Sequence, residues 1–465
     1  MSRKSKPGIK WPHILLGAGA VTAGTALLGR ALAGYAARWF ATRLMTEPYE
    51  NNLWEVISAT NRTSLQTFVE TNIRAERGQM ILRPFGDTQK FLDMDKVMFN
   101  VAQLDTFPTS YDLEISSAVV LGPRARRPLR LDIPVIISGM AYGFGLSEKA
   151  KVALAKGAAQ AGTATNTGYG PFLPEEREAA RFLIMQYNRG NWCKDPETLK
   201  KSDMLEIQLG QGALAGTGAI FKRSNMDGKM IRLLGLQPGQ DAVLHARLPE
   251  IDAPGQLGGL VDELKKIMEG KPVGVKIAAG NSLEKDLAHI LDAGADFISV
   301  DGAQGGTSGG APTLQDDFGL PTLHALCRTA RFLEQQGVKN KVSLIIGGGL
   351  TTPGDYLKAL ALGADAVNIG TIALWAMTHT QVFQSLPYEP PLQVVLFHGR
   401  DKEKLDVDKG ARNLANYLKS TVDEMKMATA ALGKKSLRAV NSKDLFALDK
   451  DVAAIAGIPL AWGQS

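Results

Sequence analysis

A glycine-rich stretch that directly follows an apolar run constrains the fold of this chain most. Residues 301–312 contain five glycines and follow the β-branched run 297–300, which predicts a buried strand. Glycine density after a strand indicates that the backbone turns sharply and lies close to another group. Related patterns recur at 342–349 and 364–371. Successive strands with glycine-rich exits predict a parallel α/β barrel whose last loops hold a phosphate.

The rest of the chain supplies the other parts of an eight-stranded TIM (β/α)8 barrel. Strands are expected near 133–138, 163–166, 182–187, 203–208, 273–277, 296–300, 342–346 and 365–369, with helices at 146–161, 256–269, 283–293, 321–336 and 353–361. The long connection 209–272 is expected to build an active-site wall. We predict an N-terminal cap over 45–132, the barrel over 133–380 and a C-terminal helical tail over 381–465, with helices at 408–432 and near 443–456.

The N-terminal segment 1–44 is predicted to be a membrane anchor or a leader. Residues 14–29 carry no charge and are flanked by Trp11, Tyr35 and Trp39, so the apolar span approaches the ~20 residues of a transmembrane helix. A single-pass membrane protein is therefore expected, with the barrel on the cytoplasmic side. A cleaved signal peptide and a loose amphipathic leader are the alternatives.

Composition excludes several classes of function. The hydrophobic content of 45% is typical of a globular protein, and the net charge of +6 includes a basic patch at 124–130 without interleaved aromatic residues. Nucleic acid is therefore not an expected partner. Cys193 and Cys327 are the two cysteines of the sequence, and an iron–sulfur cluster needs about four ligands, so none is expected. The histidines lack metal-ligand spacing, and no metal site is predicted.

Two glycine-rich strand exits predict the cofactor site. Gly348, Gly349, Gly370 and Thr371 follow the last two strands, where barrels commonly bind phosphate through backbone N–H groups and a helix N-terminus. Their spacing fits neither a dinucleotide fingerprint nor a Walker loop. We therefore expect a phosphate-bearing cofactor of another kind, the alternative being glycines that only end strands and begin helices.

Three polar side chains within or after other strands are candidates for chemistry. Lys276 lies in an apolar strand, where it either stabilises a developing negative charge or forms a structural ion pair with Asp301 or Glu206. Gln208 and Gln211 end another strand and could bond the edge of a flavin ring, or only other loop atoms. The lone Cys193 is interpreted as a buried structural thiol.

Several motifs, taken in order, resemble one family. Residues 136–143, 166–168, 211–213, 275–277 and 301–312, followed by Gly370-Thr371, resemble the FMN-binding synthase domain of glutamate synthase, and most of all its stand-alone FMN-binding relatives. The resemblance covers roughly residues 95–450 and rests on the ordered set. It implies a TIM barrel in which FMN reduces an imine, formed from 2-oxoglutarate and ammonia, to glutamate.

The resemblance also implies roles for particular residues. It places Lys276 beside the N1–O2 edge of the flavin, and it turns Asn166 and Gln211 toward substrate or flavin, so these three form the predicted catalytic set. The residues expected to line FMN are Ser138, Gly139, Met140, Gln208, Lys276, Asp301, Gly302, Gly348, Gly349, Gly370 and Thr371.

The chain departs from the family pattern mainly on the substrate side. Tyr169 and Gln208 stand where the family has an acid and a lysine, and the loop 211–218 lacks the family's lysine and acid. The cysteine cluster and the glutaminase domain of complete glutamate synthases have no counterpart, so a separate electron donor and external ammonia are expected.

The leading interpretation is thus an FMN-dependent oxidoreductase of the glutamate synthase type that acts on a small-molecule substrate. The alternatives are a flavin enzyme acting on an amine, a hydroxy acid or a membrane electron carrier, a non-catalytic barrel that binds a phosphate ligand, and a cofactor-free enzyme acting on a sugar phosphate. A homo-oligomer is compatible with each.

Overall fold

Eight parallel strands form the centre of the molecule, and the predicted TIM-like barrel is confirmed. The computed structural model describes residues 11–463, with side chains from residue 28 onward. The barrel strands are β4 (Val135–Ile137), β5 (Ala164–Asn166), β6 (Phe182–Tyr187), β7 (Met204–Gln208), β10 (Val273–Ala278), β11 (Phe297–Asp301), β12 (Ser343–Gly347) and β13 (Ala366–Ile369). They pair in the order β4-β13-β12-β11-β10-β7-β6-β5, and β4 packs against β5 where the barrel closes.

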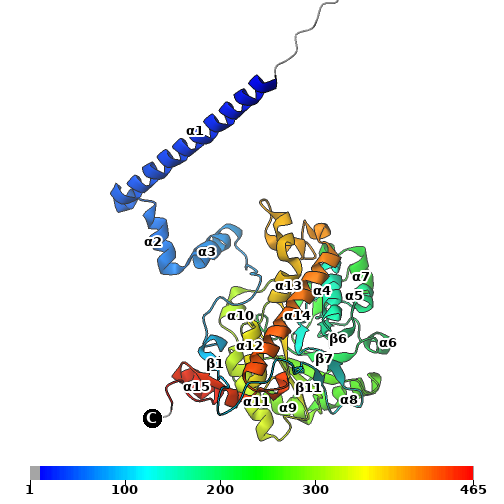
Figure 1. The fold of residues 1–465 in the computed structure, drawn as a ribbon. Helices are drawn as coiled ribbons and strands as arrows, with labels where there is room; N and C mark the ends of the chain where they lie inside the picture. The colour runs from blue at the N-terminus through cyan, green and yellow to red at the C-terminus, as the bar shows by residue number, and fades with distance from the viewer. Residues whose placement is uncertain (1–10, 464–465) are drawn as a thin grey trace, which may run out of the picture. The chain divides into compact units, whose positions relative to one another are not determined.

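Helices surround the strands, and those predicted for the barrel are present (Figure 1). They are α4 (Glu148–Gln160), α8 (Leu257–Ile267), α9 (Leu283–Asp292), α11 (Thr322–Gln335) and α12 (Pro353–Ala361). A further helix, α13 (Thr371–Thr378), was not predicted and follows the last strand. Local caps start them: Ser147 accepts from the N–H of Ala150 in α4, and Thr352 forms a capping box with Asp355 in α12. Shorter helices are α5 (Pro174–Ala179), α6 (Pro196–Leu199), α7 (Gly228–Leu234) and α10 (Pro312–Asp316).

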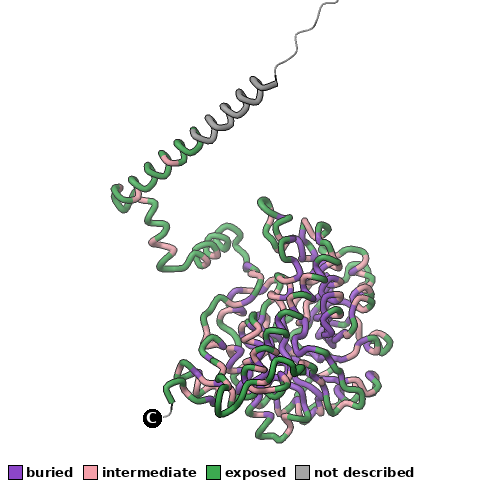
Figure 2. The backbone as a smooth tube through the Cα atoms, viewed as in Figure 1, coloured by how far each residue is buried: buried purple, intermediate pink, exposed green. Residues whose placement is uncertain are grey.

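The connection 209–272 leaves the barrel at the carboxyl end of β7. It contains the antiparallel pair β8 (Ala219–Phe221) and β9 (Ala242–Leu244), as well as α7 and α8. A second small pair, β2 (Val119–Leu121) and β3 (Leu129–Leu131), precedes the barrel. Residues buried in these elements and in the barrel make the core seen in Figure 2. The connection therefore lies at the end of the barrel where parallel strands place functional groups.

The C-terminal tail is helical only in part. The predicted helix at 408–432 is α14 (Val407–Ala431), which packs on α4 so closely that a Cβ on Gly157 would lie 2.8 Å from Leu414. The predicted helix near 443–456 begins later, as α15 (Lys450–Ala456). The preceding residues form β14 (Leu445–Ala447), which pairs antiparallel with β1 (Val97–Phe99). Pairing with a distant strand overrides the local helical pattern there.

The chain divides into two compact units after Ile81. The first contains α1 (Trp11–Thr46), α2 (Trp54–Thr63) and α3 (Leu65–Arg77). Asn52 ends α1 by donating its side-chain amide to the carbonyls of Leu44 and Glu47 at 2.8 and 3.0 Å. Ser64 begins α3 by accepting from the N–H of Thr67.

The predicted transmembrane helix is not supported. The uncharged span 14–29 falls within α1, and its side chains up to residue 27 lie outside the described ones. Within the described residues, every helix is too short or too polar to cross a membrane. The predicted single-pass anchor, and the membrane localisation based on it, are therefore wrong for the described chain. The span is rich in Gly, Ala and Thr, which supply little apolar surface, and Arg30, Arg38 and Arg43 follow within the same helix.

Candidate functional site

A cavity of about 310 Å³ opens where the barrel strands end. Its walls are the loops that follow β4, β7, β11, β12 and β13, joined by residues 84–87 from the segment before the barrel. Most of the residues predicted for the flavin site line it: Ser138, Gly139, Met140, Gln211, Lys276, Asp301, Gly348, Gly349, Gly370 and Thr371. We call this cavity the flavin pocket.

One end of the flavin pocket is built from backbone. Gly348 and Gly349 adopt φ values of 117° and 68°, which L side chains rarely adopt. A Cβ would lie 2.6 Å from the Thr322 hydroxyl at Gly348 and 2.8 Å from Gln304 Cβ at Gly349. Beside them, α13 begins at Thr371 without a side-chain cap. Its first N–H groups therefore remain available to an anion, which is what a cofactor phosphate needs. We call this the phosphate end.

A buried ion pair lies at the centre of the pocket. Lys276 Nζ is 3.0 Å from Asp301 Oδ2, and the two side chains are 2% and 10% exposed. Burial disfavours the charged amine, but the negative charges of Asp301 and Glu206 outweigh it and raise the pKa of Lys276. The predicted ion pair with Asp301 is present, and the same lysine lines the pocket as a cation. Its role in stabilising a developing negative charge stays a prediction.

Three predicted site residues lie outside the flavin pocket wall. Asn166 is buried in the barrel, where its amide donates to Glu206 at 3.0 Å and its carbonyl oxygen accepts from the N–H of Gly168. Gln208 is fully buried and donates to Gln211 Oε1 at 3.3 Å. Gly302 packs on Thr322, whose Oγ1 would lie 2.2 Å from an added Cβ. The structure thus places Asn166 and Gln208 where they support other site residues.

Glu206 connects these residues to the lysine. Its carboxylate accepts from Asn166 and, at 2.8 Å, from Gln186 Nε2, while Gln186 Oε1 is buried without a hydrogen-bond partner. Sequence reasoning named Glu206 only as an ion-pair candidate. Its position in a strand that alternates apolar and polar residues was the available signal.

Sequence reasoning missed Arg189, which is 1% exposed. Its Nε donates to Gln208 Oε1 at 3.2 Å, and its Nη1 donates to the carbonyls of Gly216 and Ala246 at 2.7 and 3.2 Å. A charged residue two positions after a barrel strand was a usable signal. Asp87, in contrast, reaches the flavin pocket from a loop with no motif, and burial raises its pKa to about 6.

Cys193 is not arranged as a nucleophile. Its sulfur accepts from the N–H of Phe172 at 3.1 Å, and burial raises the pKa of the thiol to about 11. The thiolate is therefore scarce near neutral pH, as the interpretation of a structural thiol requires.

Comparison with known proteins identifies the family. The pattern described as a conserved region in glutamate synthase matches residues 86–435. The chain belongs to the glutamate synthase family. A glutamate synthase large subunit-like protein of Rhizobium meliloti is 33% identical over 414 residues, covering 85% of this chain and 93% of the relative. An archaeal-type glutamate synthase [NADPH] of Dehalococcoides mccartyi is 29% identical, covering 80% and 78%.

Solved structures resemble this member of the glutamate synthase family in fold. A flavocytochrome b2 variant with sulfite bound matches with a TM-score of 0.50 and 16% identity, covering 80% of each chain. At this identity the likeness shows the shared barrel architecture and nothing about the site.

Proposed function

We propose that this chain is an FMN-dependent oxidoreductase that makes glutamate from 2-oxoglutarate and ammonia with electrons from a separate donor. The uncapped start of α13 beside Gly348 and Gly349 carries the proposal, because it offers N–H groups at the position where barrels bind a cofactor phosphate. Membership of the glutamate synthase family supports the reaction. In balance, 2-oxoglutarate, ammonia, two electrons and two protons give glutamate and water.

The residues present fit FMN. The phosphate end would hold its phosphate, and Ser138, Gly139 and Met140 would line the part of the pocket nearer β4. The chemistry that FMN would supply in this pocket is hydride transfer to the imine of 2-oxoglutarate. Lys276 holds a positive charge in the pocket, which stabilises negative charge that develops beside it. Asp301 and Glu206 keep that amine protonated.

Gln211 is the side chain placed to orient the substrate. Its Oε1 accepts from Gln208 Nε2, so its own amide N–H groups remain for a ligand in the flavin pocket. Asn166 acts indirectly, because its side-chain amide holds the carboxylate of Glu206 in place. In this proposal Lys276 and Gln211 are catalytic residues, and Asn166 and Gln208 are positioning residues.

A different substrate for the same cofactor is the second candidate. Tyr169 lines the flavin pocket where the family has an acid, and Gln208 replaces a lysine. Loss of the lysine removes a cation that could pair with a second carboxylate, which favours an amine or a hydroxy acid with one carboxylate over the dicarboxylate 2-oxoglutarate.

The experiment tests the proposed cofactor and the proposed substrate in separate steps. We expect the purified chain to absorb near the flavin maximum and to release FMN on denaturation, as identified by mass spectrometry. With a chemical reductant, 2-oxoglutarate and ammonia should then yield glutamate, while omission of ammonia should yield none. A flavin-loaded protein that forms no glutamate would favour the second candidate. A protein that neither contains nor takes up FMN would contradict the whole proposal.

A further inference from the structure

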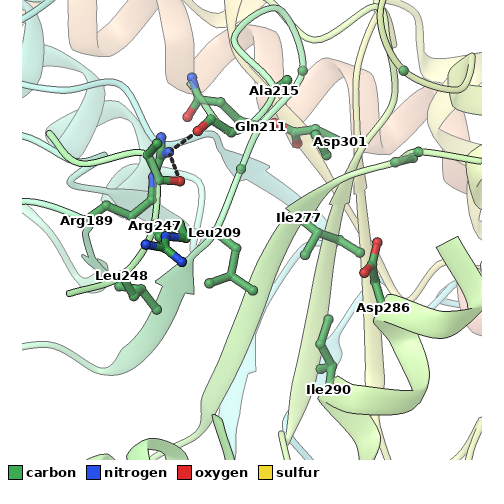
Figure 3. Close-up of a pocket in the computed structure, with 18 of the residues that line it drawn as sticks. Arg189, Leu209, Gln211, Ala215, Arg247, Leu248, Ile277, Asp286, Ile290 and Asp301 are labelled. Atoms are coloured by element: carbon green, nitrogen blue, oxygen red, sulfur yellow. Dashed lines mark hydrogen bonds between the residues drawn. The ribbon is translucent and has the colours of Figure 1, made fainter. Parts of the chain in front are cut away.

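A second cavity of about 490 Å³ adjoins the flavin pocket (Figure 3). The two share Gln211 and Asp301 in their walls. The second cavity is enclosed by the loop after β7, the residues before α8, the end of β10, and α9. Its volume falls within the range of small-molecule sites, about 300–1,000 Å³. We call it the side cavity.

Most of the side cavity is apolar. Leu209, Leu248, Ile251, Leu257, Ile277 and Ile290 line it. In Figure 3, Arg189, Arg247 and Leu248 lie to one side of the cavity, and Ile277, Asp286 and Ile290 lie to the other. A ligand with a hydrocarbon body would therefore lose little by leaving water there, since apolar surface is buried against apolar surface.

One of the charged groups that line the side cavity is a buried guanidinium that forms no ion pair with a carboxylate. Arg189 is 1% exposed, and its bonds go to the neutral oxygens of Gln208, Gly216 and Ala246. Its Nη2 has no hydrogen-bond partner among the described residues. A buried charge is costly unless it is paired, and burial lowers the pKa of this arginine. Asp252 and Asp286 also line the cavity, but neither forms an ion pair with Arg189 within the described chain, so this buried guanidinium lacks a carboxylate partner.

A second arginine reinforces the positive side of the cavity. Arg247 also lines it, is exposed, and forms no ion pair within the described chain. Guanidinium groups bind carboxylates through planar, paired hydrogen bonds, which a fixed and buried arginine makes at low entropic cost.

We propose that the side cavity is a binding site for a small monocarboxylate with an apolar body, whose carboxylate pairs with Arg189. The hydrocarbon part lies against Leu209, Ile277 and Ile290. The bound molecule is separated from the flavin pocket by Gln211 and Asp301. This site does not depend on which reaction the flavin pocket catalyses.

The experiment is calorimetric titration of the full chain, as purified, with hexanoate and with hexanamide. Hexanamide, which lacks the charge, should bind roughly thirtyfold more weakly than hexanoate, because it loses the charge-assisted hydrogen bonds to Arg189; this ratio corresponds to about 2 kcal/mol. Equal affinity for the two compounds would overturn the proposal, as would the absence of binding. The absorption spectrum of the same sample reports FMN separately, so failure here is distinguishable from failure of the proposed function.

Variants locate the site without relying on Arg189, which also bridges two loops. Gly280 lines the side cavity but not the flavin pocket, and a Cβ there would meet nothing within 4 Å. Gly280→Phe should therefore fill the cavity and abolish hexanoate binding. Gly259→Phe is the matched control, because Gly259 also has open space, lies in α8 and does not line the cavity. Unchanged binding in Gly280→Phe would place the ligand elsewhere and overturn the proposal.

Discussion

The phosphate end of the flavin pocket and the buried region around Gln208 and Arg189 are built in different ways. Gly348, Gly349 and the start of α13 present backbone groups to the pocket. The region around Gln208 is a side-chain network in which Arg189 spans two loops. A backbone site recognises a group common to every phosphate cofactor, whereas side chains select a particular substrate.

The residue at 208 is constrained by Arg189. An ammonium at 208 would lie beside the buried guanidinium of Arg189, where Gln208 offers a neutral acceptor at 3.2 Å. Like charges in a buried site repel strongly. The neutral side chain at 208 and the buried arginine at 189 therefore constrain each other.

The largest expected effect tests the phosphate end. Gly349→Asp adds a Cβ that meets Gln304 at 2.8 Å, forces a φ of 68° on an L residue and brings an acid toward the phosphate. Repulsion between the added carboxylate and the phosphate, together with displacement of the loop, should weaken FMN binding about a thousandfold, which corresponds to about 4 kcal/mol. Fluorescence titration of the apoprotein measures this. Gly354→Asp, in α12, is the control, since its Cβ meets nothing closer than 3.7 Å. Full flavin occupancy in Gly349→Asp would contradict the assignment of phosphate binding to the phosphate end.

The next effect tests the role of the buried Lys276 cation. Lys276→Met removes the charge paired with Asp301 and should slow reduction of the bound flavin by about a hundredfold, as loss of one electrostatic stabiliser typically does. Stopped-flow reduction with a chemical reductant measures the rate. Adding Asp301→Asn removes the unpaired buried acid and should restore stability without restoring the rate. An unchanged rate of flavin reduction in Lys276→Met would show that Lys276 acts only as the structural ion-pair partner of Asp301.

A smaller effect tests the coupling on the substrate side. Gln208→Lys should lower the free energy of unfolding by about 2 kcal/mol, because two buried cations would face each other. Gln208→Glu differs mainly in the sign of its charge and should keep or raise stability by pairing with Arg189. Denaturant unfolding of both variants gives the comparison. If the lysine variant is as stable as the parent, the charge at 208 is not coupled to Arg189.

The smallest effect concerns Asp87, which lines the flavin pocket from the segment before the barrel. Burial, with Asp316 and Asp93 nearby, raises its pKa from 3.8 to about 6. A raised acid pKa stabilises the fold at low pH, and that contribution is lost as pH rises from about 4 through 6. Asp87→Asn should therefore gain about 1 kcal/mol over the parent at pH 7 and nothing at pH 3.5, after allowance for partial solvent screening.

Thermal unfolding across this pH range measures the difference. Asp95→Asn is the charge-matched control, because the Asp95 side chain is 68% exposed. A constant difference between Asp87→Asn and the parent at all pH values would contradict the raised pKa.

Local pattern was enough for the barrel and for the phosphate end. The strands carry continuous apolar runs that mark buried parallel strands, and the glycines at 347–349 and 370 follow them directly in the chain. The transmembrane prediction also used a local property, the absence of charge in residues 14–29. That property was not enough, because the segment is rich in Gly, Ala and Thr.

The sequence by itself determined the order of the elements, the strand ends at which functional groups gather, and the backbone positions reserved for glycine. These follow from interactions between residues close in the chain. Only the tertiary structure decided that Lys276 pairs with Asp301, that Arg189 is buried against Gln208 without an acid, and that β14 pairs with β1 instead of extending a helix. These outcomes depend on burial and charge at residues distant in sequence, and such terms are set by packing.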